Sequence, residues 1–146
     1  MKYGVLSLLL MAIYGLASAV TPQPQHAIRT AYEEDGREIG WYVSDAQFLK
    51  TPAWKFDGRS DPPLSMPVAY SRAYAWVQKA FPKMSSFRLR SYELSTVGSS
   101  RAPNRWYYTF DFFGDVDGST VTNSKFSVMV LMDGTVVEPR ETKQSQ

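Results

Sequence analysis

The second half of the chain alternates between large apolar and polar positions, which is the pattern of β-strands whose side chains point to two opposite faces. Three strand-like stretches follow one another, residues 87–97, 105–113 and 125–132, and the third is apolar on both faces. The first of them breaks its alternation between Leu89 and Tyr92, which predicts a β-bulge. Asp133 and Gly134 form a strong tight-turn pair, and a last short strand is expected over residues 135–138. The pattern therefore predicts an antiparallel meander.

A helical pattern precedes these strands. Residues 66–81 place small or apolar side chains on one stripe, and Pro82 ends the segment. Ser65 is a favourable N-cap, and Pro67 suits a first helical turn. The stripe consists of Ala69, Ala73, Trp76, Val77 and Ala80. Because several of these residues are small, we expect the helix to lie close against a sheet.

The segment RWYYTFDFF, residues 105–113, is the most aromatic part of the chain. Alternation places four of its rings on one face: Trp106, Tyr108, Phe110 and Phe112. A buried aromatic side chain hides about 150–250 Å², and monomers seldom expose an apolar patch as large as four such rings. We therefore predict that this face is core and is packed beneath the helix.

The opposite face of the same strands is the candidate binding surface. In the run 125–132, we expect the inward face to consist of Phe126, Val128, Val130 and Met132. Met129 and Leu131 then point outward, so the run is apolar on both sides, as in a central strand that is covered on both faces. Two covers are possible: an N-terminal segment, through Trp41, Val43, Phe48 or Trp54, or a partner protein or second copy. Arg88 and Arg90 share a strand face and could hold a carboxylate. The predicted surface consists of Tyr107, Phe113, Met129, Leu131, Arg88 and Arg90.

The first half of the chain is less regular. A short strand is expected around Ile39–Val43, and residues 51–67 form a proline-rich loop that Trp54 and Phe56 pin to the body. The predicted fold class is α+β, with one main helix packed on a three- or four-stranded antiparallel meander sheet. The predicted divisions are a signal peptide over residues 1–19, a flexible leader over 20–36, a single α+β domain over 37–140 and a polar tail over 141–146.

The N-terminus has the pattern of a secretory signal peptide. Lys2 supplies the positive region, residues 4–16 form a short apolar region, and Ala17-Ser18-Ala19 fits a cleavage site. We therefore expect export to the periplasm or the medium. No second apolar run of comparable length follows, so no membrane association is expected after cleavage.

Composition excludes several kinds of chemistry. The chain of 146 residues has no cysteine, which excludes disulfides, a thiol nucleophile and thiolate zinc sites. Its formal net charge is only +2, with no basic patch that would indicate a nucleic-acid partner. His26 is the single histidine and lies in the expected leader. We predict no catalytic residue, no metal and no cofactor.

Residues 115–119, DVDGS, resemble the start of a calcium loop. Counted from Asp115, however, the glycine comes fourth and Phe126 occupies the twelfth position, where an EF-hand needs glutamate. A polar hairpin turn is the preferred interpretation. The alternative is a cation held by Asp111, Asp115, Asp117 and Asn123.

A helix followed by an antiparallel meander that closes with VMVLMDGTVVEP resembles the PepSY-type and cystatin-like α+β domains of exported bacterial proteins. The resemblance covers residues 66–138. It implies a non-enzymatic domain that binds or restrains peptidases. The cystatin inhibitory signature Q-x-V-x-G is absent, and the resemblance assigns no functional residue.

Two functions from different classes follow from these patterns. The first is an exported, non-enzymatic binding or accessory domain for a protein or peptide. The alternative is a small-molecule-binding or enzymatic cone-shaped fold, with a pocket between helix and sheet lined by Trp76, Tyr108 and Tyr92. A cavity of several hundred Å³ at that place favours the alternative, whereas a filled core favours the first. Self-association through the outer sheet face is a third possibility, which Tyr107→Asp or Leu131→Asp should abolish.

Overall fold

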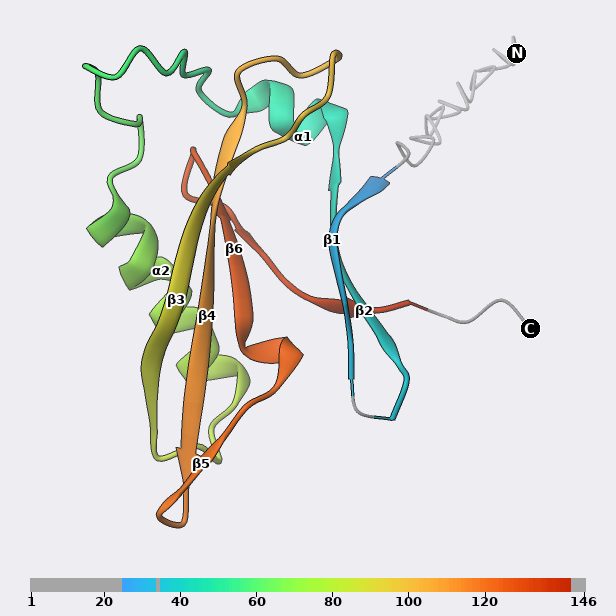
Figure 1. The fold of residues 1–146 in the computed structure, drawn as a ribbon, viewed down its shortest axis with the longest axis vertical. Coiled ribbons are helices and arrows are strands. Elements are labelled where there is room, and N and C mark those ends of the chain that lie inside the picture. The colour runs from blue at the N-terminus through green and yellow to red at the C-terminus, as the bar shows by residue number, and fades with distance from the viewer. Residues whose placement is uncertain (1–24, 34, 143–146) are drawn as a thin grey trace, which may run out of the picture.

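The computed structural model describes residues 25–33 and 35–142, which form two antiparallel sheets and one long helix (Figure 1). The large sheet has five strands: β3 (Ser86–Thr96), β4 (Trp106–Val116), β6 (Ser127–Leu131) and β7 (Val136–Val137) in this order, with β5 (Ser119–Val121) paired to β4. The small sheet has three strands in the order β1 (Gln25–Tyr32), β2 (Glu38–Ser44) and β8 (Arg140–Glu141). The helices are α1 (Asp45–Lys50), α2 (Met66–Ala80) and the single 3-10 turn η1 (Ser124–Phe126).

The predicted fold of one meander sheet with a helix is wrong in its sheet count, because the chain builds a second sheet. Residues 25–32 of the expected leader form β1, which pairs with β2 from Gln25↔Ser44 to Tyr32↔Glu38. Backbone pairing with β2 and the packing of Ile28 and Ala31 hold this strand, whose sequence QHAIRTAY lacks the run of large apolar residues that signals a strand. Similarly, β8 joins β2 opposite Ile39 and Gly40. The predicted signal peptide lies outside the described residues.

Strand β4 is the central element of the large sheet. β3 pairs along one of its edges from Trp106 to Asp115, with a register shift between Leu89 and Ser91, which confirms the predicted bulge. On the other edge, β6 pairs with residues 107–111 and β5 with residues 114–116. β5 and β6 thus follow one another along the same edge of β4, and residues 122–126, which include η1, join them.

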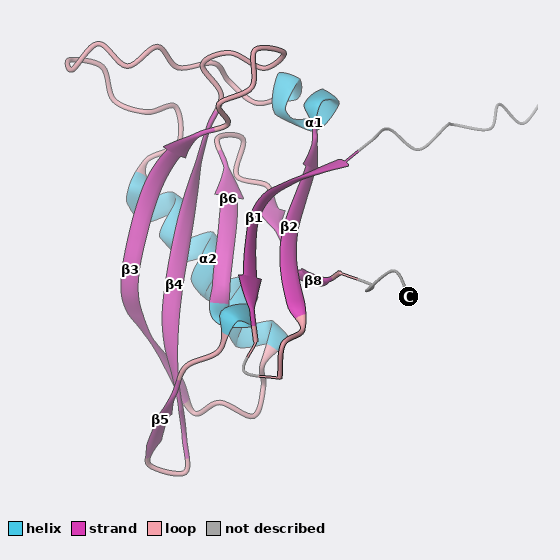
Figure 2. Cartoon of the chain, turned by 45° about the vertical axis from the view of Figure 1, so that its right-hand side comes forward, coloured by secondary structure: helices cyan, strands magenta, loops and turns pink. Residues whose placement is uncertain are grey.

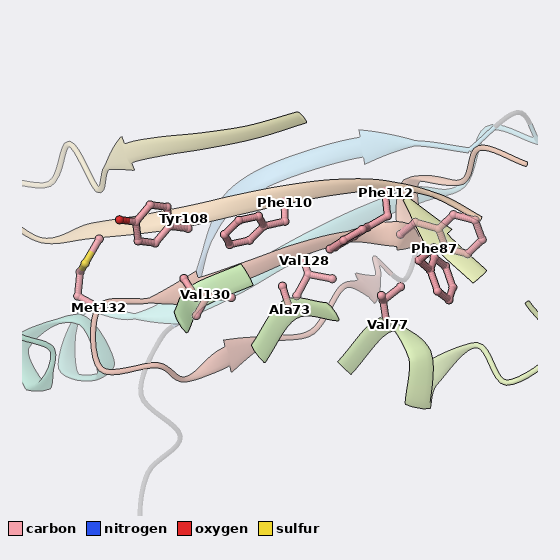
Figure 3. Packing of buried hydrophobic residues seen from close by; sticks show 11 residues of the cluster. Ala73, Val77, Phe87, Tyr108, Phe110, Phe112, Val128, Val130 and Met132 are labelled. Carbon is pink, nitrogen blue, oxygen red and sulfur yellow. The ribbon is translucent and has the colours of Figure 1, made fainter. Parts of the chain in front are cut away.

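Helix α2 covers one face of the large sheet, and the space between them is filled (Figure 3). Ala69, Ala73 and Val77 of α2 are fully buried, so the helix lies close to the strands as predicted. Against them pack side chains of β3, β4, η1 and β6 and of Met132: Phe87, Tyr108, Phe110, Phe112, Phe126, Val128, Val130 and Met132. Trp106 is only partly buried; its ring lies 5.1 Å from that of Trp54 and 6.3 Å from that of Phe56.

The small sheet and α1 cover part of the other face (Figure 2). Trp41, Val43 and Phe48 are each 1 % exposed and pack in one cluster with Tyr107, Met129 and Leu131. This confirms that an N-terminal segment covers the outer face through three of the four residues expected to do so. Trp54, the fourth, lies instead in the group with Phe56 and Trp106.

Local sequence explains why α1 begins where it does. The Ser44 side chain accepts a hydrogen bond from Gln47 N, and the Gln47 side chain accepts one from Ser44 N, which is a complete capping box. This turn directs Phe48 onto the sheet. Ser65, by contrast, caps α2 without a side-chain hydrogen bond. Within residues 25–33 and 35–142, no helix is long and apolar enough to cross a bilayer.

Candidate functional site

A cleft of about 880 Å³ opens where the small sheet stops covering the large one. We call it the β1–β4 cleft. β1 and the turn after it form one wall, while β3, β4, β5 and the segment 122–127 form the floor and the other wall. The cleft exists because the small sheet covers β6 and the first part of β4 but leaves the β3 side of the outer face uncovered. Its volume is within the range of sites that bind small molecules or short peptide segments, about 300–1,000 Å³.

An ion pair crosses the cleft from β1 to β4. A guanidinium nitrogen of Arg29 lies 3.5 Å from Asp111 Oδ1, and the same guanidinium stands 5.8 Å from the centre of the Trp41 ring. Ser91 on β3 donates a hydrogen bond of 3.2 Å to Asp111 Oδ2. Arg29 and Asp111 are each about one-third exposed, with 36 % and 28 % of the side chain accessible. Both groups are therefore positioned and still within reach of a ligand.

Two polar atoms beside the cleft are buried and have no hydrogen-bond partner among the described residues: Ser127 Oγ and Glu33 Oε1. Ser127 is only 4 % exposed, and its carbonyl accepts from Trp41 Nε1 at 3.2 Å while its hydroxyl is unused. Leaving a buried polar group unpaired costs about 1–3 kcal/mol. Because such groups are rare in native proteins, each of them calls for an explanation, and a bound ion or water is one.

Two arginines of β3 stack on one ring, and one of them, Arg90, lines the cleft. The guanidinium groups of Arg88 and Arg90 lie 5.8 and 5.5 Å from the centre of the Phe113 ring. Arg88 Nε also donates to Asp115 Oδ2 at 3.1 Å. Hydrogen bonds from Arg88, Thr120 and Ser86, in that order of importance, hold the pKa of Asp115 far below its usual range. Asp115 is thus a fixed anion that anchors Arg88 beside Phe113.

The structure divides the predicted outer-face surface into two parts. Tyr107, Met129 and Leu131 are buried beneath β2 and α1, and burial raises the pKa of the Tyr107 phenol. An aspartate at position 107 or 131 would therefore disrupt this core, so it cannot serve as a specific test of self-association. The remaining three residues, Phe113, Arg88 and Arg90, lie together, and Arg90 among them lines the β1–β4 cleft.

Sequence reasoning missed the part of the site that β1 contributes. Arg29 lies in the segment expected to be a loose leader, and no local pattern pairs it with Asp111, which is 82 positions away (111 − 29). Asp111 was considered only as an alternative cation ligand. The described residues contain no group of three or more acidic or histidine side chains that could hold a metal. Asp111 and Asp115 are instead engaged by arginines.

The alternative pocket between helix and sheet is not where the structure places its cleft. Tyr108 is 2 % exposed and its hydroxyl donates to the Leu64 carbonyl, while Trp76 Nε1 donates to Glu138. Tyr92 is 52 % exposed and stacks over Phe110 at 6.2 Å. The three side chains therefore do not converge on a cavity, and the space beneath α2 is filled by its own core (Figure 3).

Comparison with protein-family models, with curated proteins and with solved structures finds no significant match.

Proposed function

We propose that the chain is an exported, non-enzymatic binding domain that holds a protein or peptide ligand in the β1–β4 cleft. The cleft itself carries the proposal, because it combines a volume of about 880 Å³ with a pre-formed Arg29–Asp111 pair and an unpartnered buried hydroxyl at Ser127. A concave site with a few positioned polar groups is the usual form of a ligand site.

Two features favour binding over catalysis. Two acids of the cleft region, Asp111 and Asp115, are held by arginines and hydroxyl groups. The filled space beneath α2 also argues against the pocket that the enzymatic alternative requires. The resemblance of residues 66–138 to PepSY-type domains is the reason to propose a protein or peptide as ligand.

Export rests on the signal-peptide pattern of residues 1–19. Cell fractionation tests it directly: a C-terminally tagged full chain should be recovered from the periplasm or medium in a form shortened by about the length of a signal peptide. Full-length chain retained in the cytoplasm would contradict export.

Capture with a cleft-blocking variant tests the binding function. Thr122 is exposed and lines the cleft, so Thr122→Trp should fill it. Ser71→Trp is the matched control, because Ser71 is exposed on α2, which packs on the other face of the large sheet. The tagged full chain and both variants are incubated with envelope extract and culture fluid of the source cells. Bound material is then compared by mass spectrometry.

The proposal predicts a component that wild type and Ser71→Trp retain equally and that Thr122→Trp loses. A component retained by all three proteins, or no retained component, would contradict binding at this cleft. Thermal unfolding followed by circular dichroism confirms that both variants are folded before the comparison is made.

A further inference from the structure

We infer that the ligand of the β1–β4 cleft is an extended peptide segment that pairs with the free edge of β1 and presents a carboxylate to Arg90. This inference rests on the proposed function and specifies its ligand. Three observations carry it: the open edge of β1, the unpaired guanidinium of Arg90, and the separation of charges between the two sides of the cleft.

The first observation concerns backbone groups. β1 pairs with β2 on one edge only, and among the described residues no strand pairs with the other edge. Arg29, Ala31 and Tyr32 of β1 line the β1–β4 cleft. Figure 2 shows that the free edge of β1 lies on the side away from β2, toward β6. The Tyr32 carbonyl receives only a long hydrogen bond, 3.4 Å, from Ser124 Oγ across the cleft. An unpaired edge is a template that an extended peptide can join by main-chain hydrogen bonds.

The neighbouring edge is less suited to this role. The outer edge of β3 is also unpaired among the described residues, but β3 carries the bulge between Leu89 and Ser91 and the charged side chains of Arg88 and Arg90. Bulges and edge charges are the usual means by which proteins prevent edge-to-edge pairing. β1 therefore provides the better template, and it is the edge that lies inside a cleft.

The second observation concerns Arg90. Within the described part of the chain, Arg29 pairs with Asp111 and Arg88 with Asp115, but Arg90 makes no ion pair. Its guanidinium is held in place by stacking on Phe113 at 5.5 Å, and Arg90 lines the cleft. A guanidinium that is fixed by an aromatic ring and has free N–H groups is suited to a carboxylate.

The third observation is that charge is distributed unevenly along the cleft. Arg90 lies on the β3 side, whereas Glu33, with its unpartnered Oε1, and Asp35 lie on the turn after β1. Arg37 Nε lies 2.6 Å from Asp35 Oδ2, so Asp35 is already paired. Of the two acids on this turn, Glu33 is therefore the one with an oxygen that has no hydrogen-bond partner. A peptide has both kinds of group: carboxylates for Arg90 and N–H donors for Glu33. A uniformly anionic ligand would meet repulsion at Glu33.

A phage-displayed library of random dodecapeptides, panned on the tagged full chain, supplies the probe. Enriched peptides are synthesised with fluorescein and measured by fluorescence anisotropy, each also with its Asp and Glu replaced by Asn and Gln, and with a free or an amidated C-terminus. Comparison of these peptides shows whether Arg90 binds an acidic side chain or the C-terminal carboxylate of the peptide. The protein variants are Arg90→Gln and the matched Lys79→Gln, which removes one positive charge from α2.

The inference predicts enriched peptides whose affinity falls about tenfold, roughly 1.4 kcal/mol, with Arg90→Gln. Affinity should fall similarly when the peptide carboxylate is removed, and Lys79→Gln should leave it unchanged. Amide NMR shifts on binding should centre on residues 25–32. Enriched peptides that lack a carboxylate, or that bind Arg90→Gln as tightly as wild type, would overturn the inference.

The outcome of the capture experiment separates the two proposals. If Thr122→Trp abolishes capture of a component while the library yields no peptide that depends on Arg90, the binding function stands and the peptide assignment fails. Recovery of cell-wall glycan in place of protein would overturn both proposals, because the proposed function also names a protein or peptide as the ligand. If Thr122→Trp has no effect on capture, the binding function itself fails.

Discussion

At the scale of single residues, Trp41 connects the two sheets. It is 1 % exposed, and its indole donates a hydrogen bond of 3.2 Å to the carbonyl of Ser127 on β6. The strand that contains Trp41 was predicted from the sequence as a short strand around residues 39–43. The partner of Trp41 could not be predicted, because a contact between residues 86 positions apart leaves no local pattern.

Trp41→Phe should destabilise the protein by about 1–3 kcal/mol, because it removes the donor and leaves a buried carbonyl with one partner fewer. Trp76→Phe is the control: the Trp76 indole donates to Glu138 in an exposed setting, so its loss should cost less than about 1 kcal/mol. Urea unfolding followed by far-UV circular dichroism measures both. Equal effects of the two changes would contradict the assigned role of Trp41.

Asp115 should make stability depend on acidity. Its pKa is lowered in the folded chain by hydrogen bonds from Arg88, Thr120 and Ser86, whereas in the unfolded chain it is about 3.9. A lowered folded-state pKa means that the stabilisation is complete above the unfolded value and is lost as the pH falls below it. The urea midpoint of wild type should therefore decline more steeply below about pH 4 than that of Asp115→Asn.

The control for this pH dependence is Asp61→Asn, since Asp61 is exposed and forms no ion pair among the described residues. Its profile should follow that of wild type. Parallel curves for wild type and Asp115→Asn between about pH 5 and pH 2 would show that the Arg88–Asp115 contact does not form in solution.

At the scale of elements, periodicity predicted well where large apolar side chains alternate and poorly where a strand carries few of them. α2, β3, β4 and β6 lie close to their expected ranges, because Phe110, Val128 and similar residues are sorted to one face. β1 and β8 have no such sorting and were missed. One wall of the candidate site consists of β1 and the turn after it, so the cleft could not be predicted.

The two helix starts provide a matched pair of substitutions. Ser44→Ala should cost about 1 kcal/mol, because it removes the side-chain half of a capping box. Ser65→Ala should cost only a few tenths, since Ser65 makes no side-chain capping bond. Urea unfolding of both variants checks the difference. A larger loss from Ser65→Ala than from Ser44→Ala would contradict the capping geometry.

Gly114 allows β4 to pass close to the 3-10 turn η1. A Cβ at this position would lie 2.9 Å from Cε2 of Phe126 and 3.1 Å from Sδ of Met84. Phe126 is 2 % exposed and has little room to move, so Gly114→Ala should cost about 1–3 kcal/mol through overpacking. Ser119→Ala, at an exposed position on β5, is the control and should be nearly neutral. Wild-type stability of Gly114→Ala would show that η1 packs differently.

At the scale of the whole molecule, one sheet is covered on one face by a helix and on the other by a smaller sheet that stops short. The covering of the first face was predicted, because the sequence indicated a helix packed on an antiparallel meander. The aromatic strand, with Tyr108, Phe110 and Phe112 beneath α2, was correctly assigned to the core. The small sheet, which covers part of the second face, contains β1, a strand without apolar alternation. The part of the second face that the small sheet leaves uncovered forms the β1–β4 cleft.

Hydrogen–deuterium exchange of the full chain, alone and saturated with the component that Thr122→Trp fails to capture, tests this account most directly. The account predicts slowed exchange in residues 25–32 and 119–127, on the two sides of the cleft, with no change in α2. Slowed exchange confined to α2 and the β3 edge near Tyr92, with residues 25–32 unchanged, would contradict it.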